Sequence, residues 1–549
     1  MLGQILVQAA YVQLVSIVHR IKVLKIEVAN FNASVEYCVI SIRRRLPRSL
    51  RTSENSRYAK FARDSGSFPK RPGKGPSGIR RGQLGPELFQ RPARPVSKLT
   101  NVEGHTPTTP SSSYALRLVL GYLHLRRSPG SASKISGDSR GVVLCVFPSK
   151  GGRVQCFWKA TLVGDGRGLM RVEQLRGIED VDRETWRALE APEFPFFDFD
   201  FLHALEHSGS IGRRSGWSPA YLVCREVGGV LGALCVYLKT DSYGEYIFDW
   251  EWARAYQQYG LSYYPKLVAA VPFTPATGPK LLLRPEVDVT TRARVTNALL
   301  EAAEDLGTEY GVSSSHALFL PEHELDEFTK RGFAVRYSLQ FHWRNRGYGT
   351  FSDYLEALSG KRRRQILRER RQLKGEALEI SHLTGEALLP EHAKLMHRFY
   401  LSTLDGKWGV PYLNRAFFDE VFKTMKDRTL LVLARDRAGS PVAGALFFLK
   451  DNSLFGRYWG SAQQRRNLHF ELCYYQAIDF AIARGFKLLE AGAQGEHKLA
   501  RGFLPSLTYS AHKIRDPTFE RVIGRYIASE KVMLQGIIDE YASHNPYKR

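Results

Sequence analysis

A dense group of ionisable and polar side chains occupies residues 490–501, with glycines at 492 and 495. Carboxylates and imidazoles exchange protons near neutral pH, whereas Lys and Arg bind carboxylates and phosphates. We therefore predict acid–base chemistry and anion binding in this segment, with a paired carboxylate or ordinary surface charge as the alternative. The residues predicted for catalysis are Glu490, Glu496 and His497, and those predicted to bind substrate are Gln494, Lys498 and Arg501.

Four further side chains are predicted to border the same site. His469 and Glu471 lie at the start of a predicted helix, where capping and the helix dipole are an alternative explanation for Glu471. Trp459 and Trp408 are predicted to line a substrate pocket, although aromatic side chains also serve as ordinary core. None of these residues has a metal-ligand spacing, and no CxxC pair occurs among the six cysteines, so we predict no metal site.

The elements that position this group form a strand–helix–strand unit within 454–505. Leu454–Trp459 is rich in apolar and aromatic residues and predicts a strand. An apolar stripe predicts a helix over about 470–484, with Asn467 as its cap and Gly485 at its end. A second strand, Phe486–Ala491, runs into the polar group. Ligand sites of open α/β sheets lie at such carboxyl ends of strands.

A second basic segment, KRRRQILRERRQLK, is predicted to be a helix over 361–374 and contains eight basic residues. Arg-rich segments suit bidentate phosphate contacts, as in a CoA pyrophosphate, a nucleotide or RNA, while a solvated helix face is the alternative. The predicted phosphate-binding residues are Arg362, Arg363, Arg364, Arg465 and Arg466.

The net charge of +24 is concentrated at the N-terminus. Residues 1–140 hold 24 Lys and Arg against 7 Asp and Glu, which leaves 55 and 48 for the rest of the chain. This Arg-, Ser- and Pro-rich stretch cannot bury much apolar surface, so residues 1–165 are predicted to be a disordered basic leader. Its composition favours an organellar transit region, with an untargeted tail or an extension outside the true reading frame as alternatives. No apolar run is long enough to span a membrane.

The order of predicted elements occurs twice. An apolar hairpin with Gly232 in its second strand leads to further strands and a helix, and a hairpin with Gly444 begins the same order again. We predict an α/β (α+β) fold of two lobes over 166–345 and 346–549. Each lobe is expected to hold a mixed, mostly antiparallel sheet flanked by helices.

HFELCYYQAIDFAIARG followed by EAGAQGEHKLARGFLP resembles the FemAB-like (peptidoglycan biosynthesis/recognition) family of the GNAT acyltransferase superfamily, as do SYGEYIFDWEWA and LSGKRRRQILRERR. The resemblance covers about 200–515. It implies two fused GNAT-like lobes and an acyl or aminoacyl transfer that forms an amide. A non-catalytic protein that binds a glycan, peptide or RNA is the alternative.

The loop AQQRRNL before the main helix lacks the glycines with which GNAT enzymes hold CoA pyrophosphate. No tightly bound cofactor is expected, and acyl-CoA or aminoacyl-tRNA are the possible co-substrates. Expected partners are a small-molecule or peptide amine acceptor and possibly tRNA. The leader favours an organellar stroma or matrix, chloroplast before mitochondrion, with a soluble cytoplasmic protein as the alternative.

Overall fold

The computed structural model describes residues 25–28, 40–43, 139–148, 154–164, 169–404, 410–493 and 495–548, with side chains from Met170 onward. The chain divides into two units, one of residues 1–122 and 146–155 and the other of residues 123–145 and 156–549. In the first unit, β1 (Lys25–Val28) and β2 (Ile40–Arg43) pair antiparallel. The leader prediction otherwise lies outside the described residues. All that follows concerns the second unit.

A six-stranded sheet has the order β11-β8-β7-β5-β4-β3. Its hairpin of β7 and β8 turns at Gly228-Gly229 and alternates apolar residues toward the core, as predicted. Because β4 pairs with β5, this sheet begins before residue 166, where the first lobe was expected to start. Its strands are β3 (Ser139–Pro148), β4 (Val154–Gly164), β5 (Leu169–Leu175), β7 (Tyr221–Glu226), β8 (Gly229–Leu234) and β11 (Leu281–Leu283).

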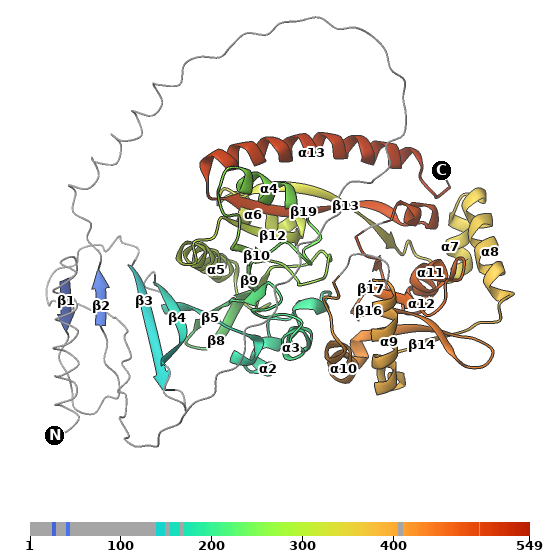
Figure 1. The fold of residues 1–549 in the computed structure, drawn as a ribbon, viewed down its shortest axis with the longest axis horizontal. Coiled ribbons are helices and arrows are strands. Elements are labelled where there is room, and N and C mark those ends of the chain that lie inside the picture. Colours follow the sequence, from blue (N-terminus) through green and yellow to red (C-terminus); the bar gives the residue numbers. More distant parts are fainter. Residues whose placement is uncertain are drawn as a thin grey trace, which may run out of the picture. The chain divides into compact units, whose positions relative to one another are not determined.

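An eleven-stranded sheet runs through both lobes in the order β14-β15-β16-β17-β18-β13-β19-β12-β10-β9-β6. Figure 1 shows its two long central strands, β13 and β19, beneath the C-terminal helix α13. The other strands are shorter and flank this pair. They are β6 (Trp217–Pro219), β9 (Val236–Lys239), β10 (Lys266–Ala269), β12 (Ser314–Leu320), β13 (Ala334–Arg344), β14 (Glu379–Leu383), β15 (Thr429–Arg435), β16 (Pro441–Lys450), β17 (Ser453–Ser461), β18 (Leu488–Glu490) and β19 (Leu504–Ile514).

The two lobes exchange their last strands. β13 ends the first half of the sequence, yet it pairs with β18 of the second half. β19 ends the second half and pairs with β12 of the first. The two exchanged strands also pair with each other from Ala334 to His342. Each lobe's sheet is therefore completed by a strand from the other half of the chain, and the two sheets become one.

The predicted repetition of one unit is confirmed by the pairing. In the first lobe β10 and β12 are parallel with α5 between them, and in the second lobe β17 and β18 are parallel with α11 and α12 between them. The helices are α2 (Arg183–Arg187), α3 (Phe199–His207), α4 (Trp250–Gln258), α5 (Val289–Glu309), α6 (Leu325–Thr329), α7 (Phe351–Ala357), α8 (Gly360–Lys374), α9 (Pro390–Ser402), α10 (Arg415–Thr424), α11 (Leu468–Phe470), α12 (Gln476–Ala483) and α13 (Pro517–Ser543).

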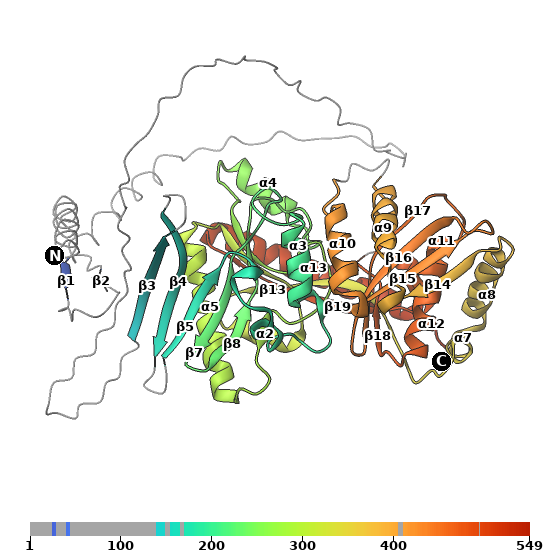
Figure 2. The same ribbon diagram turned by 90° about the horizontal axis from the view of Figure 1, so that it is seen from below.

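The lobes are joined by α3 and α10, which lie side by side in Figure 2. At the start of α3, the buried carboxylates of Asp198 and Asp200 accept from Arg428, and Asp198 also accepts from Lys450 at 2.6 Å. Apolar side chains of both lobes form one core cluster here, with Phe196 packed edge-on against Phe448. Among the described residues, no helix has the length and apolar character required to cross a membrane.

Candidate active site

The site is built where β17 and β18 separate. The two strands pair in parallel only from Ser453–Leu488 to Phe455–Glu490. Beyond that point Gly492 turns the chain with a φ of 81°, a conformation that favours glycine, while β17 runs on to Ser461. We call this divergence the fork. It places the residues after Glu490 at a carboxyl end of a strand, as the sequence predicted.

The helix that follows β17 begins irregularly. Asn467 was expected to cap it, but this prediction is wrong, because Asn467 adopts a left-handed φ of 66° and its side chain donates to Gln372 instead. Between α11 and α12 the chain forms a π-helical turn, η7 (Glu471–Tyr475). Such turns shift side chains relative to a regular helix and often occur at functional sites. Here the turn aims Tyr474 at the fork.

Two histidines and two aromatic side chains meet at the fork. The Tyr474 hydroxyl and His497 Nε2 are 2.8 Å apart, and the rings of Trp459 and His469 meet edge to face with centroids 4.9 Å apart. Burial lowers the pKa of His469 to about 4, helped by the positive charges of His497, Lys498 and Arg501. Burial also lowers the pKa of His497. Both imidazoles are thus held neutral at physiological pH and can act as proton acceptors or as hydrogen-bond partners.

The predicted polar group folds as a 3-10 helix, η8 (Glu496–Arg501), and it divides into two faces. Glu496 and His497 are exposed, and Glu496 interacts with Tyr541. Lys498 and Arg501 are buried, at 1% and 3% exposure. Glu496, the first choice for a general base, therefore stands in solvent, where nothing activates a carboxylate.

Lys498 is a buried amine with a single protein acceptor. Its Nζ donates to the Gly492 carbonyl at 2.7 Å. Burial lowers its pKa to about 8, and Arg457 lowers it further, against the opposing effect of Cys473. A lysine this close to neutrality can orient an acyl carbonyl or exchange a proton.

Arg501 and Glu471 are instead bound inside the protein. Arg501 donates to both carboxylate oxygens of Glu369 at 2.9 Å, to the Tyr475 hydroxyl at 2.9 Å and to the His497 carbonyl at 2.7 Å. Glu471 pairs with Arg370 at 3.0 Å. Because Glu369 and Arg370 belong to α8, these contacts attach the basic helix to the second lobe. They favour structural roles over the predicted substrate binding.

The predicted phosphate-binding residues are spread over two elements. Arg362 and Arg363 are half-buried and Arg364 is exposed on α8. Arg465 pairs with Glu376 at 2.9 Å, while Arg466 is exposed. The exposed cations of α8 form a stripe at helical spacing, and within the described residues no carboxylate pairs with them. They are Lys361, Arg364, Arg368 and Arg371. Gln494 and Trp408 lie outside the described residues.

Glu490 lies in a buried polar layer between the lobes. It is 5% exposed, faces His342 of β13 at 3.7 Å, and accepts from the Thr277 backbone, while its Oε2 has no hydrogen-bond partner in the structure. Burial raises its pKa to about 7, an increase that the charges of Arg457, Arg344 and Lys280 oppose. Burial lowers the pKa of His342 to about 3, and its Nε2 lies 3.1 Å from the Gln340 amide oxygen. A carboxyl with a pKa near 7 matches the requirement for a general base at neutral pH.

Two cavities approach this layer. A cleft of about 890 Å³ reaches Thr277, Phe455 and Leu488, which adjoin Glu490, and it is lined by more acidic than basic side chains. A smaller cavity, of about 360 Å³, is lined by His342 with Arg344 and Arg346, and carboxylates are missing from its described lining. The charged residues of the larger cleft are Glu190, Glu193, Arg292, His323, Glu324, Glu327 and Asp451.

The sequence analysis did not identify His342, Arg344 and Tyr474 as site residues. A usable signal was present in β13, where Phe341 and Trp343 alternate with His342 and Arg344. That alternation puts the two polar side chains on one face of the strand. The face itself could not be assigned, because β13 pairs with a strand 150 residues further along the chain, between His342 and Glu490.

Residues 177–549 match the FemAB-like family, described as peptidoglycan biosynthesis/recognition. The chain belongs to the FemAB-like family. This confirms the resemblance seen in the sequence. No curated protein matches the sequence significantly.

Several solved structures resemble the FemAB-like chain in fold at low identity. FemX is 10% identical, with a TM-score of 0.40 over 63% of this chain and 98% of FemX. L-PGS from Bacillus licheniformis is 10% identical, with a TM-score of 0.37 over 59% of this chain and 95% of that one. A tandem GNAT protein from the clavulanic acid biosynthesis pathway is 14% identical, with a TM-score of 0.35 over 63% and 99%.

Proposed function

We propose that this FemAB-like protein is an acyl- or aminoacyltransferase that forms an amide on an amine acceptor by direct transfer between two bound substrates. The observation that carries the proposal is Glu490, a buried carboxyl with a pKa near 7 and an unpartnered oxygen. An unpaired buried carboxyl costs free energy of folding, and such costs concentrate at functional sites. Its role is to accept the proton of the attacking amine, directly or through a water molecule.

The charges of the two cavities suit two different substrates. The larger cleft has five acidic residues against Arg292 and His323, which favours a cationic amine acceptor. The smaller cavity presents Arg344 and Arg346, which favours an anionic donor. Because Glu490 lies between the two, an amine from one side and an acyl group from the other would meet beside the base.

The transfer requires no covalent intermediate on the protein. The amine nitrogen attacks the acyl carbonyl while Glu490 takes the amine proton, and the bond from the carbonyl to the departing thiol or hydroxyl breaks. Lys498, with a pKa of about 8, is suited to return a proton to the leaving group. His497 with Tyr474, and Trp459 with His469, would hold the acyl portion at the fork.

Aminoacyl-tRNA is the donor that we favour over acyl-CoA. The loop over 462–467 contains no glycine, and the structure ties Arg465 of this loop to Glu376. Close backbone approach to a pyrophosphate is therefore hindered. The stripe of unpaired cations on α8, from Lys361 to Arg371, instead offers several contacts to the phosphates of a long polyanion.

The test is a binding panel on the full chain that compares acyl-CoA thioesters with aminoacyl-tRNAs by calorimetry. We expect one donor class to bind, and the variant Arg344→Ala/Arg346→Ala to weaken that binding at least about tenfold through lost charge-assisted hydrogen bonds. Arg521→Ala, an exposed arginine on α13, is the control and should bind as the native chain does. Binding of a glycan or peptide with neither donor class would favour the non-catalytic alternative. The organellar location stays a prediction.

A further inference from the structure

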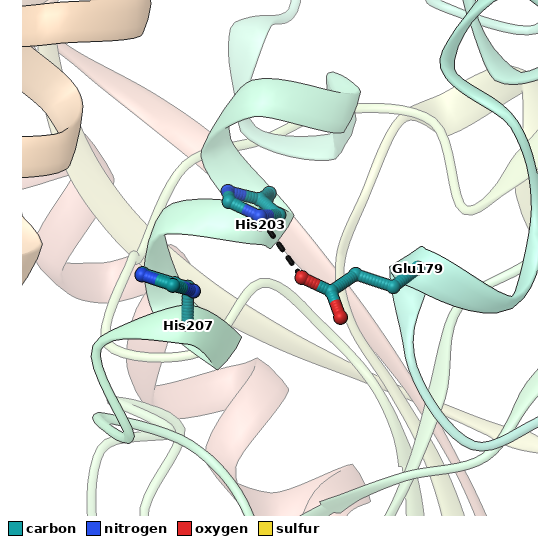
Figure 3. A group of neighbouring side chains, drawn as sticks. All are labelled: Glu179, His203 and His207. Atoms are coloured by element: carbon teal, nitrogen blue, oxygen red, sulfur yellow. Dashed lines mark hydrogen bonds and ion pairs between the residues drawn. The ribbon is translucent and has the colours of Figure 1, made fainter.

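A second group of chemically competent side chains lies far from Glu490 in the fold, on α3. His203 and His207 are four residues apart and project from the same face of this helix toward Glu179, which lies in the turn η2 (Ile178–Asp180), as Figure 3 shows. The two imidazole rings are stacked, with centroids 5.1 Å apart and planes inclined by 14°. One ligand atom from each of the three residues lies within 4.8 Å of the others.

This geometry is close to that of a divalent metal site. His203 Nε2 and a Glu179 carboxylate oxygen are 3.1 Å apart. Tetrahedral zinc, with ligand bonds of about 2.0–2.2 Å, sets its ligand atoms about 3.3 Å apart. One edge of the tetrahedron therefore already has its length. Rotation of His207, which is exposed, would supply the third ligand.

The opposite nitrogen of His203 has a carboxylate facing it. Nδ1 is buried without a hydrogen-bond partner and lies 3.8 Å from an oxygen of Glu420 on α10. A histidine that binds metal through one nitrogen commonly donates its other N–H to a carboxylate, which fixes the tautomer and the ring orientation. Glu420 is in position to accept that proton after a small movement.

The turn that carries Glu179 is also held in place. Glu206, between the two histidines in sequence, accepts from the Ile178 backbone at 2.9 Å and from the Tyr221 hydroxyl at 2.7 Å. Gly177 permits this approach, because a Cβ there would lie 2.4 Å from a Glu206 oxygen. Four side chains thus form an ordered arrangement in which two bind and two position.

We propose that Glu179, His203 and His207 form a binding site for Zn²⁺, with a water molecule as the fourth ligand and Glu420 orienting His203. Two imidazoles and a carboxylate are typical zinc ligands. The sequence analysis predicted no metal because it considered only the residues near the fork. The spacing of two histidines four apart on a helix was the signal that it passed over.

The site is inferred to bind and not to hydrolyse. Histidines with this spacing and a glutamate immediately before the second also occur in zinc peptidases, where that glutamate activates water. In this protein Glu206 is committed to Tyr221 and Ile178 and cannot reach the metal. The bound ion would instead connect η2 to α3 and, through His203, strengthen the contact of α3 with α10. It would therefore brace the junction of the two lobes.

The experiment is a calorimetric titration of the full chain, freed of metal by chelation, with zinc chloride alone. We expect His203→Ala and His207→Ala each to weaken one Zn²⁺-binding event at least about 100-fold, and Glu420→Gln to weaken it about tenfold. His544→Gln, an exposed histidine on the C-terminal side, is the matched control and should leave the titration unchanged. At a hundredfold excess over the dissociation constant, Zn²⁺ should raise the melting temperature by about 3 °C in the native chain and not in His207→Ala.

Two results would overturn the proposal. A zinc titration of His207→Ala that superimposes on the native one would mean that the ion binds elsewhere. Binding that is lost in His207→Ala but unaffected by Glu420→Gln would mean a casual chelate of surface side chains, without the built arrangement proposed here. Substitution with Co²⁺ supplies an independent readout, since a tetrahedral site with two imidazoles gives visible absorption that an unbound ion lacks.

Discussion

Replacing Glu490 by Gln separates the chemical role of this carboxyl from its structural one. Gln has nearly the same shape and keeps an oxygen that can accept from the Thr277 backbone, but it cannot take a proton. If Glu490 is the general base, turnover with the donor identified by the binding panel should fall at least about 100-fold. In the native chain, turnover should rise with pH through about 7, since the base works only when ionised.

The same substitution should stabilise the protein at alkaline pH. The pKa of Glu490 is raised by burial from 4.5 to about 7, which corresponds to about 3 kcal/mol of destabilisation once the group is ionised. This cost is absent below pH 4.5, grows as the pH rises and is complete above pH 7. The free energy of unfolding of Glu490→Gln, relative to the native chain, should therefore be largest at pH 8 and small at pH 5.

The assay is urea denaturation at both pH values, together with turnover. Glu206→Gln is the control, because burial raises the pKa of Glu206 to about 7 as well, yet its partners are Tyr221 and Ile178, far from the fork. That variant should change the pH dependence of stability and keep normal turnover. If Glu490→Gln retained turnover within about threefold, or lost stability at pH 8, the reasoning would fail, because the carboxylate would then be a paired structural group.

Three further outcomes are expected. Lys498→Met should gain stability below pH 8 by removing a buried amine whose pKa is depressed to about 8, and the gain should vanish toward pH 10; a uniform loss would show that the Gly492 contact dominates. Arg428→Ala should cost about 3 kcal/mol in urea denaturation because it leaves Asp198 and Asp200 buried with too few partners, whereas Lys426→Ala, in an exposed pair, should cost less than about 0.5 kcal/mol. Gly460→Ala should cost more than about 3 kcal/mol or prevent folding, since its Cβ would lie 1.7 Å from the Phe399 carbonyl oxygen; normal melting of this variant would contradict the packing described.

The local elements were predictable because their signals are local. The apolar stripe of 470–484, the glycine turn of β7 and β8 and the Asp182 cap of α2 all appear in the structure close to their expected places. The stretch from Tyr243 to Trp252 reads as a strand, yet α4 begins at Trp250. There Asp249 is bound by Lys266 and Tyr263, and Trp252 and Tyr256 pack on α13 through Phe519 and its neighbours. Tertiary contacts overrode the aromatic pattern.

The site was only partly predictable. The segment from Glu490 to Arg501 lies at the fork as expected, but the sequence does not show which of its side chains are buried. Exposure of Glu496 and burial of Lys498 follow from the turn of a six-residue 3-10 helix, a detail of a fraction of one turn. The partners of Arg501 and Glu490 come from α8 and β13, and such distant pairings leave no local trace.

The exchange of β13 and β19 has a consequence for the birth of the protein on the ribosome. Until residues 504–514 have left the exit tunnel, β12 keeps an open edge and β13 has neither of its neighbours. The first half therefore cannot mature on its own during synthesis, and it must wait for almost the whole polypeptide while its unpaired edge stays open to wrong partners. The same arrangement means that two separately made halves, cut between β13 and α7, would each be incomplete alone and would complement one another when mixed, since each carries the strand that the other lacks.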